Sequence, residues 1–169
     1  MAETTNGSDR QEALKKINEL IKDIRIALLT TAGPDGTLHS RPMATQKSEF
    51  AGELWFLTRE DSGKVFDIHH DANVSLTYAD GKNTFVALSG RARVSRDQAK
   101  INELWNPMYT AWFPQGKEDP EIRVVRVTVD AAEYWDAPSN AVVRNFQLLL
   151  AAVTAGHVKV GENEAVWLR

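Results

Sequence analysis

The sequence predicts a single α+β domain: an antiparallel barrel of six or seven strands with helices at its ends. Short segments rich in β-branched, aromatic or alternating apolar residues recur through most of the 169 residues, and turns with glycine or proline separate them. Segments with helical spacing of apolar residues lie near both ends. Neither an internal repeat nor a long linker divides the sequence, so we expect one domain.

The N-terminal region is expected to lead from a tail into a helix. Residues 1–8 are polar, which predicts a disordered tail ahead of a domain that spans 9–169. Ser8 stands three residues before Gln11, the spacing of a capping box. Apolar residues at helical spacing then predict a core-covering helix from about 9 to 23: Leu14, Ile17, Ile21 and Ile24.

The strands follow in order. We predict them at 26–31, 37–46, 54–58, 74–78, 84–94, 122–129 and 132–135. The turn over 33–36, with sequence Gly-Pro-Asp-Gly, makes the first two a hairpin. In the strand over 84–94, apolar side chains share one face while Arg91 and Arg93 share the other, so the face with the two arginines is expected to be exposed to solvent.

Further helices are predicted between and after these strands, at 61–71, 97–106 and 139–155. Pro107 ends the second of them, and Gly156 stands at the stop position of the last. Residues 108–120 are expected to form a loop rich in aromatic residues and proline.

Composition excludes several classes of function. Without cysteine, the chain has no disulfide, thiol nucleophile, iron–sulfur cluster or cysteine-ligated zinc. Twenty Lys and Arg against 23 Asp and Glu give a net charge of −3, which disfavours nucleic acid as a partner. The longest apolar run, 148–153, is too short to span a membrane, and no signal sequence opens the chain. A cytoplasmic protein is expected.

The most informative segment is the strand Trp55-Phe56-Leu57-Thr58 and the turn after it. Ser62 is placed to cap the next helix, whose first-turn amides form a ready anion site. Lys64 lies in that first turn, where the helix dipole disfavours a cation, so a bound anion would explain its position. The alternative is a solvated surface lysine beside a capping serine.

A second unusual segment is Arg41-Pro42-Met43, in which proline interrupts a strand-like run. Proline cannot donate to a strand ladder, so it belongs at an edge, a bulge or a place where a ligand lies. Arg41 could then offer a fork of donors to a phosphate. Alternatively, its charge and the proline protect an exposed edge strand against aggregation.

Aromatic residues provide a third signal, because five tryptophans are many for this length. Aromatic walls with a few polar groups suit a planar heteroaromatic ligand, although most tryptophans belong to cores. Trp112 is a candidate lid in the aromatic loop, with packing at a subunit interface as the alternative. His69 and His70 are adjacent and lack metal-ligand spacing, so we expect no metal site. No side chain is a persuasive catalytic acid or base, which leaves the catalytic residues unknown.

Five short segments occur in a definite order: Ser40 to Met43, Leu54 to Thr58 with Ser62 and Lys64, Asn73 to Leu76, Val86 to Ala92, and Glu133 to Trp135. In this order they resemble the FMN-binding split-barrel flavoproteins related to pyridoxamine 5′-phosphate oxidase, and most of all the bacterial general stress proteins. The resemblance covers about residues 10–155. It implies a six-stranded antiparallel split β-barrel of Greek-key topology with flanking helices, forming a homodimer with FMN at the interface.

The same resemblance implies roles for individual residues. The segment from Arg41 through Pro42 to Met43 would lie along the flavin and its ribityl chain, and the strand through Thr58 beside the isoalloxazine ring. Ser62 and Lys64 would hold the phosphate. Trp135 would reach the flavin from the partner subunit.

Two departures argue against oxidation of vitamin B6. The arginine and histidine that hold pyridoxal phosphate in the oxidases are replaced by the run from Asp136 to Asn140, and Phe85 stands where they carry glutamine. We therefore expect an FMN-dependent oxidoreductase that passes electrons between a nicotinamide donor and an unidentified small acceptor, with FAD as the alternative flavin. A flavin-binding carrier or sensor without turnover is the rival. A deazaflavin or haem enzyme of the same fold is a weaker third reading.

Overall fold

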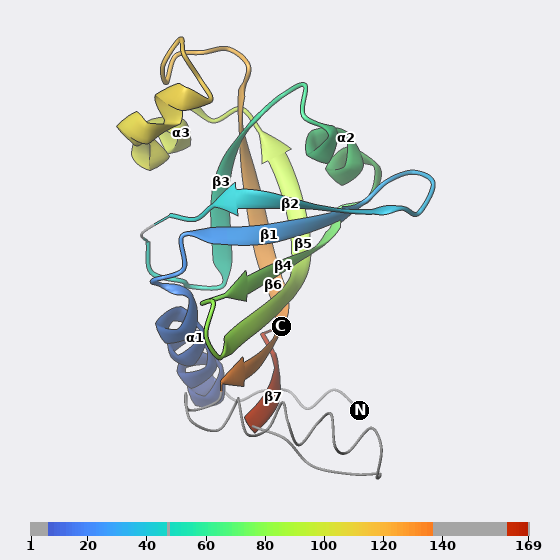
Figure 1. The fold of residues 1–169 in the computed structure, drawn as a ribbon, viewed down its shortest axis with the longest axis vertical. Helices are drawn as coiled ribbons and strands as arrows, with labels where there is room; N and C mark the ends of the chain where they lie inside the picture. Colours follow the sequence, from blue (N-terminus) through green and yellow to red (C-terminus); the bar gives the residue numbers. More distant parts are fainter. Residues whose placement is uncertain (1–6, 47, 137–161, 169) are drawn as a thin grey trace.

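The computed structural model describes residues 7–46, 48–136 and 162–168, and all structural statements refer to these (Figure 1). The elements in chain order are α1 (Gly7–Ile21), β1 (Ile26–Ala32), β2 (Leu38–Ala44), β3 (Glu53–Arg59), α2 (Gly63–His70), β4 (Asn73–Ala79), β5 (Thr84–Ser95), α3 (Gln98–Leu104), the 3-10 helix η1 (Pro107–Ala111), β6 (Ile122–Asp136) and β7 (Glu162–Trp167). The helix predicted over 139–155 lies outside the described residues. Helix α1 begins at Gly7, within the segment expected to be a tail.

The strands form one antiparallel sheet in the order β2-β1-β4-β5-β6-β3, and β7 pairs with the second half of β6. Strands β4, β5 and β6 are consecutive neighbours, and β6 also lies beside β3, which precedes all three in the chain; this is the order of a Greek key. Figure 1 shows β1 and β2 crossing in front of β3 and β6 as the sheet curls. Because β2 and β3 end the strand order without pairing, the barrel is split, and the predicted α+β fold is confirmed.

Two predicted strands are in fact one. Residues 122–129 and 132–135 belong to the continuous β6, which bends at a β-bulge opposite β5. Ser89 pairs with Ala131 but Gly90 pairs with Val129, so one extra residue of β6 lies between them. At Gly90 a Cβ atom would lie 2.2 Å from the carbonyl oxygen of Thr128, and only glycine fits this close approach.

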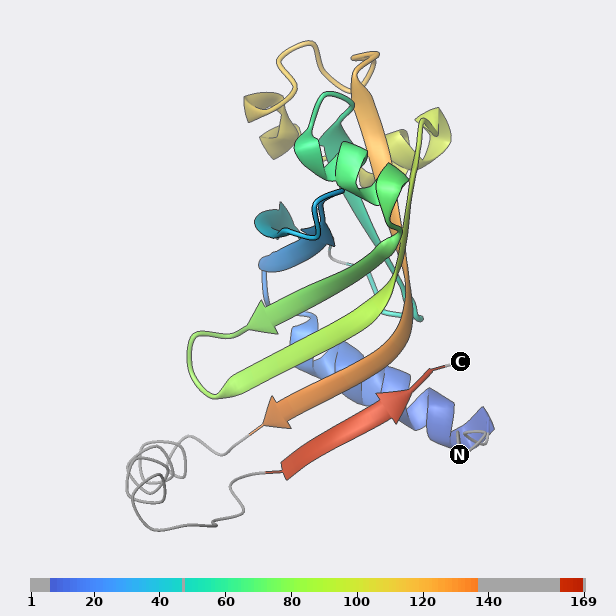
Figure 2. The same ribbon diagram turned by 90° about the vertical axis from the view of Figure 1, so that its right-hand side faces the viewer.

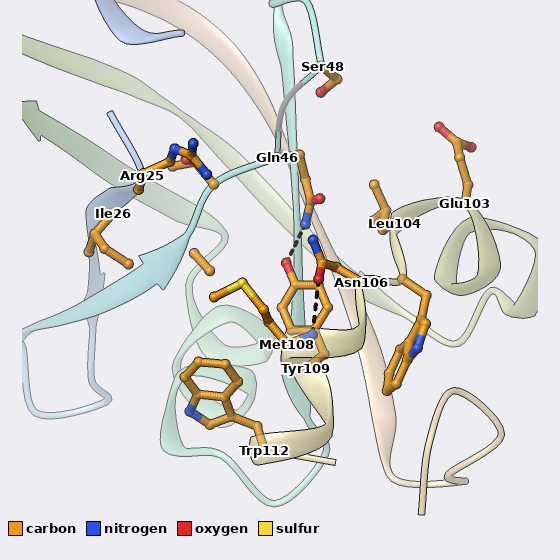
Figure 3. A pocket seen from close by; sticks show the side chains of 13 residues that line it. Arg25, Ile26, Gln46, Ser48, Glu103, Leu104, Asn106, Met108, Tyr109 and Trp112 are labelled. Carbon is orange, nitrogen blue, oxygen red and sulfur yellow. Dashed lines mark hydrogen bonds between the residues drawn. The ribbon is translucent and has the colours of Figure 1, made fainter. Parts of the chain in front are cut away.

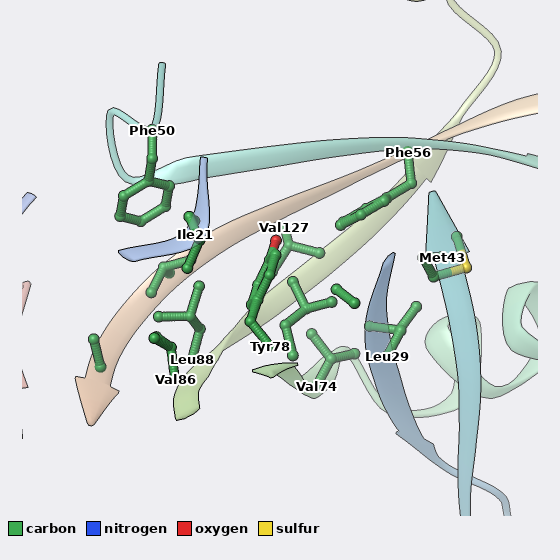
Figure 4. Packing of buried hydrophobic residues seen from close by; sticks show 14 of the residues in the cluster. Ile21, Leu29, Met43, Phe50, Phe56, Val74, Tyr78, Val86, Leu88 and Val127 are labelled. Carbon is green, nitrogen blue, oxygen red and sulfur yellow. The ribbon is translucent and has the colours of Figure 1, made fainter. Parts of the chain in front are cut away.

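The main core fills the barrel (Figure 4). Val86 and Leu88 of β5 are buried while Arg91 and Arg93 are exposed, as the alternating pattern predicted. Helix α1 contributes its apolar stripe to the same core and lies behind β6 and β7 in the view of Figure 2. The largest fully buried side chain is Tyr78, which stands in the middle of this cluster.

A second, smaller core lies beneath α3 and the aromatic loop. Asp97 caps α3 by accepting a hydrogen bond from the Lys100 amide at 3.0 Å. The predicted loop contains η1, which begins where the Asn106 side chain accepts from the Met108 amide at 3.0 Å. This turn of helix is anchored by buried Tyr109, and it presents Trp112 at the surface.

Candidate functional site

The turn from β3 into α2 gathers polar side chains around one lysine. Ser62 occupies the N-cap position of α2, but its side chain does not cap the helix. Instead, the Ser62 hydroxyl accepts a hydrogen bond from Lys64 Nζ at 2.7 Å, and Thr58 Oγ1 accepts a second at 3.1 Å. The lysine is therefore folded back over the first turn of its own helix rather than extended into solvent.

The ammonium group of Lys64 lies in an unfavourable place for a cation. Burial is the main cause that lowers the pKa of Lys64 below its usual value, and the positive charge of Arg41 lowers it further. Within the described part of the chain, no carboxylate forms an ion pair with Lys64. A half-buried cation without a counter-ion, at the N-terminus of a helix, is arranged to receive an anion.

Arg41 approaches the same turn from β2. Its Nη2 atom lies 3.2 Å from the position that a Cβ atom would take on Gly63. Its other terminal nitrogen, Nη1, donates to Thr31 and to Asp67. A guanidinium and an ammonium group thus converge on the start of α2, and the repulsion between them would be relieved by a bound anion.

A pocket of about 420 Å³ opens beside this cationic end. Seven of the residues that the sequence singled out line it: Pro42, Met43, Leu57, Thr58, Ser62, Lys64 and Trp112. Ile26, Tyr109 and Phe113 complete its apolar wall. The pocket is therefore polar at one end, where Lys64 and the ion pair of Arg59 and Asp61 line it, and aromatic and aliphatic along its length.

A neighbouring pocket of about 450 Å³ shares Ile26, Ala44, Tyr109 and Trp112 with the first (Figure 3). In this second pocket the Gln46 amide donates to the Tyr109 hydroxyl at 2.6 Å. The two hollows are adjoining compartments of one groove, with Tyr109 and Trp112 at their boundary.

Other residues expected at the site lie elsewhere in the single chain. Phe56 is 1% exposed in the barrel core, where Figure 4 shows its ring. Trp55 lies on the opposite face of β3, with Lys100 Nζ 4.4 Å from its ring centroid. Trp135 is 38% exposed on β6 opposite Phe85, and it does not line either pocket.

Sequence reasoning missed Tyr109 and Asp67. Tyr109 counts among the aromatic residues expected to provide flat walls for a planar ligand, but it was not singled out as a site residue, because its segment was expected to be irregular. In the sequence, Asp67 looks like a surface residue of a short helix. In the structure it is 4% exposed, and it accepts hydrogen bonds from Thr31 of β1 and Arg41 of β2. Neither contact has a local signature, because the partners lie far away in the sequence.

The family model described as "Pyridoxamine 5′-phosphate oxidase like" matches residues 12–159. The chain belongs to this family. A curated relative, protein bli-3 of Neurospora crassa, is 30% identical over 76% of this chain and 68% of its own length.

Solved structures agree with this membership. The general stress FMN/FAD binding protein of Xanthomonas citri is 30% identical, has a TM-score of 0.66, and is matched over 76% of this chain and 92% of its own. A protein related to general stress protein 26, from Clostridium acetobutylicum, has a TM-score of 0.69 over 94% of this chain and 96% of its own. Its identity of 19% supports the fold alone.

Within the described residues, no group of three or more His, Cys, Asp or Glu side chains is placed to hold a metal ion. None of their helices has the length and apolar character needed to cross a bilayer.

The site fits the flavin nucleotide that the family resemblance implies. A phosphate monoester carries a charge of about −1.5 to −2 at neutral pH, which the two cations at the start of α2 can balance. The apolar length of the pocket, with Met43, Leu57 and Phe113, suits a flat ring system.

Proposed function

We propose that this member of the family binds FMN in the 420 Å³ pocket, with the phosphate against Lys64 and Ser62 and the ring along the apolar wall. Arg41 does not line the pocket itself, but its Nη2 atom lies beside Gly63 at the start of α2, where it would reach the same phosphate. The observation that carries the proposal is Lys64: a half-buried ammonium group that donates to two hydroxyls and pairs with no described carboxylate. The flavin specificity follows from charge. The monoester of FMN places close to two negative charges on one phosphate, whereas each phosphate of FAD, the alternative, carries one.

The active form in this proposal is a homodimer. Five large apolar side chains are exposed on one outer face of the sheet: Ile26, Leu28, Phe85, Trp135 and Trp167. Several large apolar side chains exposed on one face mark an interaction surface. A second copy that covered it would bring Trp135 to the groove of its partner, which accounts for its absence from the pocket of its own chain.

A flavin bound here would supply hydride or single-electron transfer, so we propose an oxidoreductase that draws on a nicotinamide donor in the cytoplasm. Met43, Trp112 and Phe113, which line the pocket, would hold the ring and exclude water from it. Among the described residues that line the pockets, the Tyr109 hydroxyl lies at the boundary of the two, and no histidine lines either.

Because the pockets offer few groups that could act as a catalytic acid or base, a flavin carrier or sensor of the stress response is the second candidate. Rapid mixing of the flavin-loaded protein with NADH or NADPH separates the two. Fast bleaching of the flavin band supports the oxidoreductase, and a band that stays unchanged for minutes supports the carrier.

The proposal itself is tested by purifying the protein, recording its visible spectrum, and titrating the flavin-free form with FMN. A flavin band, or saturable binding with one site per chain, is the expected result. A colourless protein that binds no added FMN would contradict the proposal.

A further inference from the structure

We propose that Asp67 is a positioning residue of the anion site. Together with Thr31 it holds the guanidinium group of Arg41 at the start of α2, where that group meets the phosphate beside Lys64. The inference rests on the proposed binding of FMN, but it concerns a buried carboxylate that does not line the pocket.

The contacts of Asp67 converge on a single oxygen atom. Its Oδ2 accepts hydrogen bonds from Thr31 Oγ1 at 2.7 Å and from Arg41 Nη1 at 3.1 Å, and it lies 3.2 Å from Nδ1 of His39. Arg41 Nη1 also donates to Thr31 Oγ1 at 2.8 Å, which closes a three-membered network. Thr31 and Asp67 are almost completely buried, whereas the Arg41 side chain is 28% exposed. One edge of the guanidinium is therefore fixed to the protein interior.

Fixing that edge determines where the other edge points. Nη2 lies close to Gly63, 3.2 Å from where a Cβ would be, so glycine leaves the room that the guanidinium occupies. A free arginine side chain has considerable rotamer entropy, which a ligand must otherwise restrict on binding. The repulsion from Lys64 would also drive an unrestrained Arg41 towards solvent.

The charge of Asp67 and its geometry have opposite effects on an anion. A carboxylate in contact with Arg41 lowers the local positive potential and so weakens the binding of an anion through charge alone. Holding Arg41 in place strengthens binding. If removing Asp67 weakens the binding of FMN, its positioning of Arg41 dominates; if it strengthens the binding of FMN, its charge dominates. A purely structural role would change the affinities for FMN and riboflavin alike.

Two substitutions separate the effects. Asp67→Asn can place its amide oxygen where Oδ2 accepts all three donors, so it removes the charge and keeps the acceptor. Asp67→Ala removes both. We expect Asp67→Ala to weaken FMN about tenfold and riboflavin by less than about twofold, and Asp67→Asn to bind FMN within about threefold of the wild type or more tightly.

The measurement is equilibrium titration of flavin fluorescence with each flavin-free protein. The inference is overturned if Asp67→Ala binds FMN as tightly as the wild type or more tightly, or if it loses both flavins equally. A wild type that does not prefer FMN to riboflavin refutes the proposed function as well. A wild type with that preference, retained in Asp67→Ala, refutes only the role of Asp67.

Two further variants keep the test decisive if Asp67→Ala does not fold. Thr31→Val preserves the shape of the side chain but removes the hydroxyl that accepts from Arg41, and Gly63→Ala places a methyl group against Nη2. Both should reduce the preference for FMN over riboflavin. The matched control is Phe66→Ala, an exposed position on the same helix, which should leave that preference unchanged. An unchanged preference in both Thr31→Val and Gly63→Ala would contradict the inference.

Discussion

The ammonium group of Lys64 lies 2.7 Å from the hydroxyl of Ser62, and this contact replaces the helix cap that a serine at this position ordinarily provides. The serine thus orients a cation over the start of α2. The arrangement costs stability in the absence of a ligand, because a half-buried ammonium group has lost part of its hydration. That cost is the physical reason to expect an anion there.

The first prediction concerns alkaline pH. Burial and then Arg41 lower the pKa of Lys64 below 10.5, and a bound phosphate would raise it again. Binding of FMN should therefore take up a proton at alkaline pH, and the affinity for FMN should fall as pH rises through the lowered pKa. Calorimetric titrations in buffers of different ionisation enthalpy measure this uptake. Riboflavin, which has no phosphate, should show a flat profile, and parallel profiles for the two flavins would contradict the assignment.

The second prediction tests the outer sheet face. Leu28 is 46% exposed on β1, and Leu28→Asp should dissociate the dimer because it buries an unpaired charge in an apolar interface. Light scattering after size exclusion gives the mass directly. Phe66→Asp is the control, since Phe66 is 65% exposed on α2 and should leave the mass of the dimer unchanged. A monomeric wild type would refute the proposed dimer.

The third prediction concerns the hydroxyl of Tyr78, which is buried and has no hydrogen-bond partner among the described residues. An unsatisfied buried polar group costs about 1–3 kcal/mol, so Tyr78→Phe should raise the free energy of unfolding by about 1 kcal/mol. Urea unfolding measures it. Tyr109→Phe is the matched comparison and should be destabilising, because the Tyr109 hydroxyl accepts a hydrogen bond from Gln46. A destabilised Tyr78→Phe would show that this hydroxyl does have a partner.

The fourth prediction is the acid dependence of stability through Asp67. Burial alone would raise the pKa of Asp67, but hydrogen bonds from Thr31, Arg41 and His39 outweigh it and hold the pKa below 3.8. The ionised carboxylate therefore stabilises the fold above about pH 4, and this contribution is lost as pH falls through the lowered pKa. Asp67→Asn should be less stable than the wild type by about 1–3 kcal/mol at pH 7. The difference should shrink below pH 3.8 in urea unfolding, and a gap that stays constant would exclude ionisation as its cause.

Local patterns explain why much of the fold could be predicted. The hairpin of β1 and β2 was predicted from the Gly33–Gly36 turn, which adjoins both strands. Strand β7 was missed because its strand conformation comes from pairing with β6, about 30 residues earlier, rather than from its own polar sequence. The continuity of β6 was missed because the residue that interrupts its alternation is a bulge, a feature that only the partner strand defines.

At the site, too, contacts between residues close in the sequence could be predicted, and contacts between distant residues could not. Ser62, Thr58 and Lys64 lie within seven residues of one another, so a strand, a turn and a helix start were enough to bring them together. The contact between Thr31 and Asp67 spans 36 positions, and that between Gln46 and Tyr109 spans 63. Such contacts depend on how the barrel closes, which no local pattern encodes.

The most direct test of the central claim is the affinity of the wild type and of Lys64→Ala for FMN and for riboflavin. A charge-assisted hydrogen bond is worth about 1.5–3 kcal/mol, so Lys64→Ala should bind FMN about 10- to 150-fold more weakly. Riboflavin should bind both proteins equally, and Lys117→Ala, an exposed lysine outside the pocket, should behave as the wild type. Equal losses for the two flavins, or no loss for either, would show that the phosphate does not lie at Lys64.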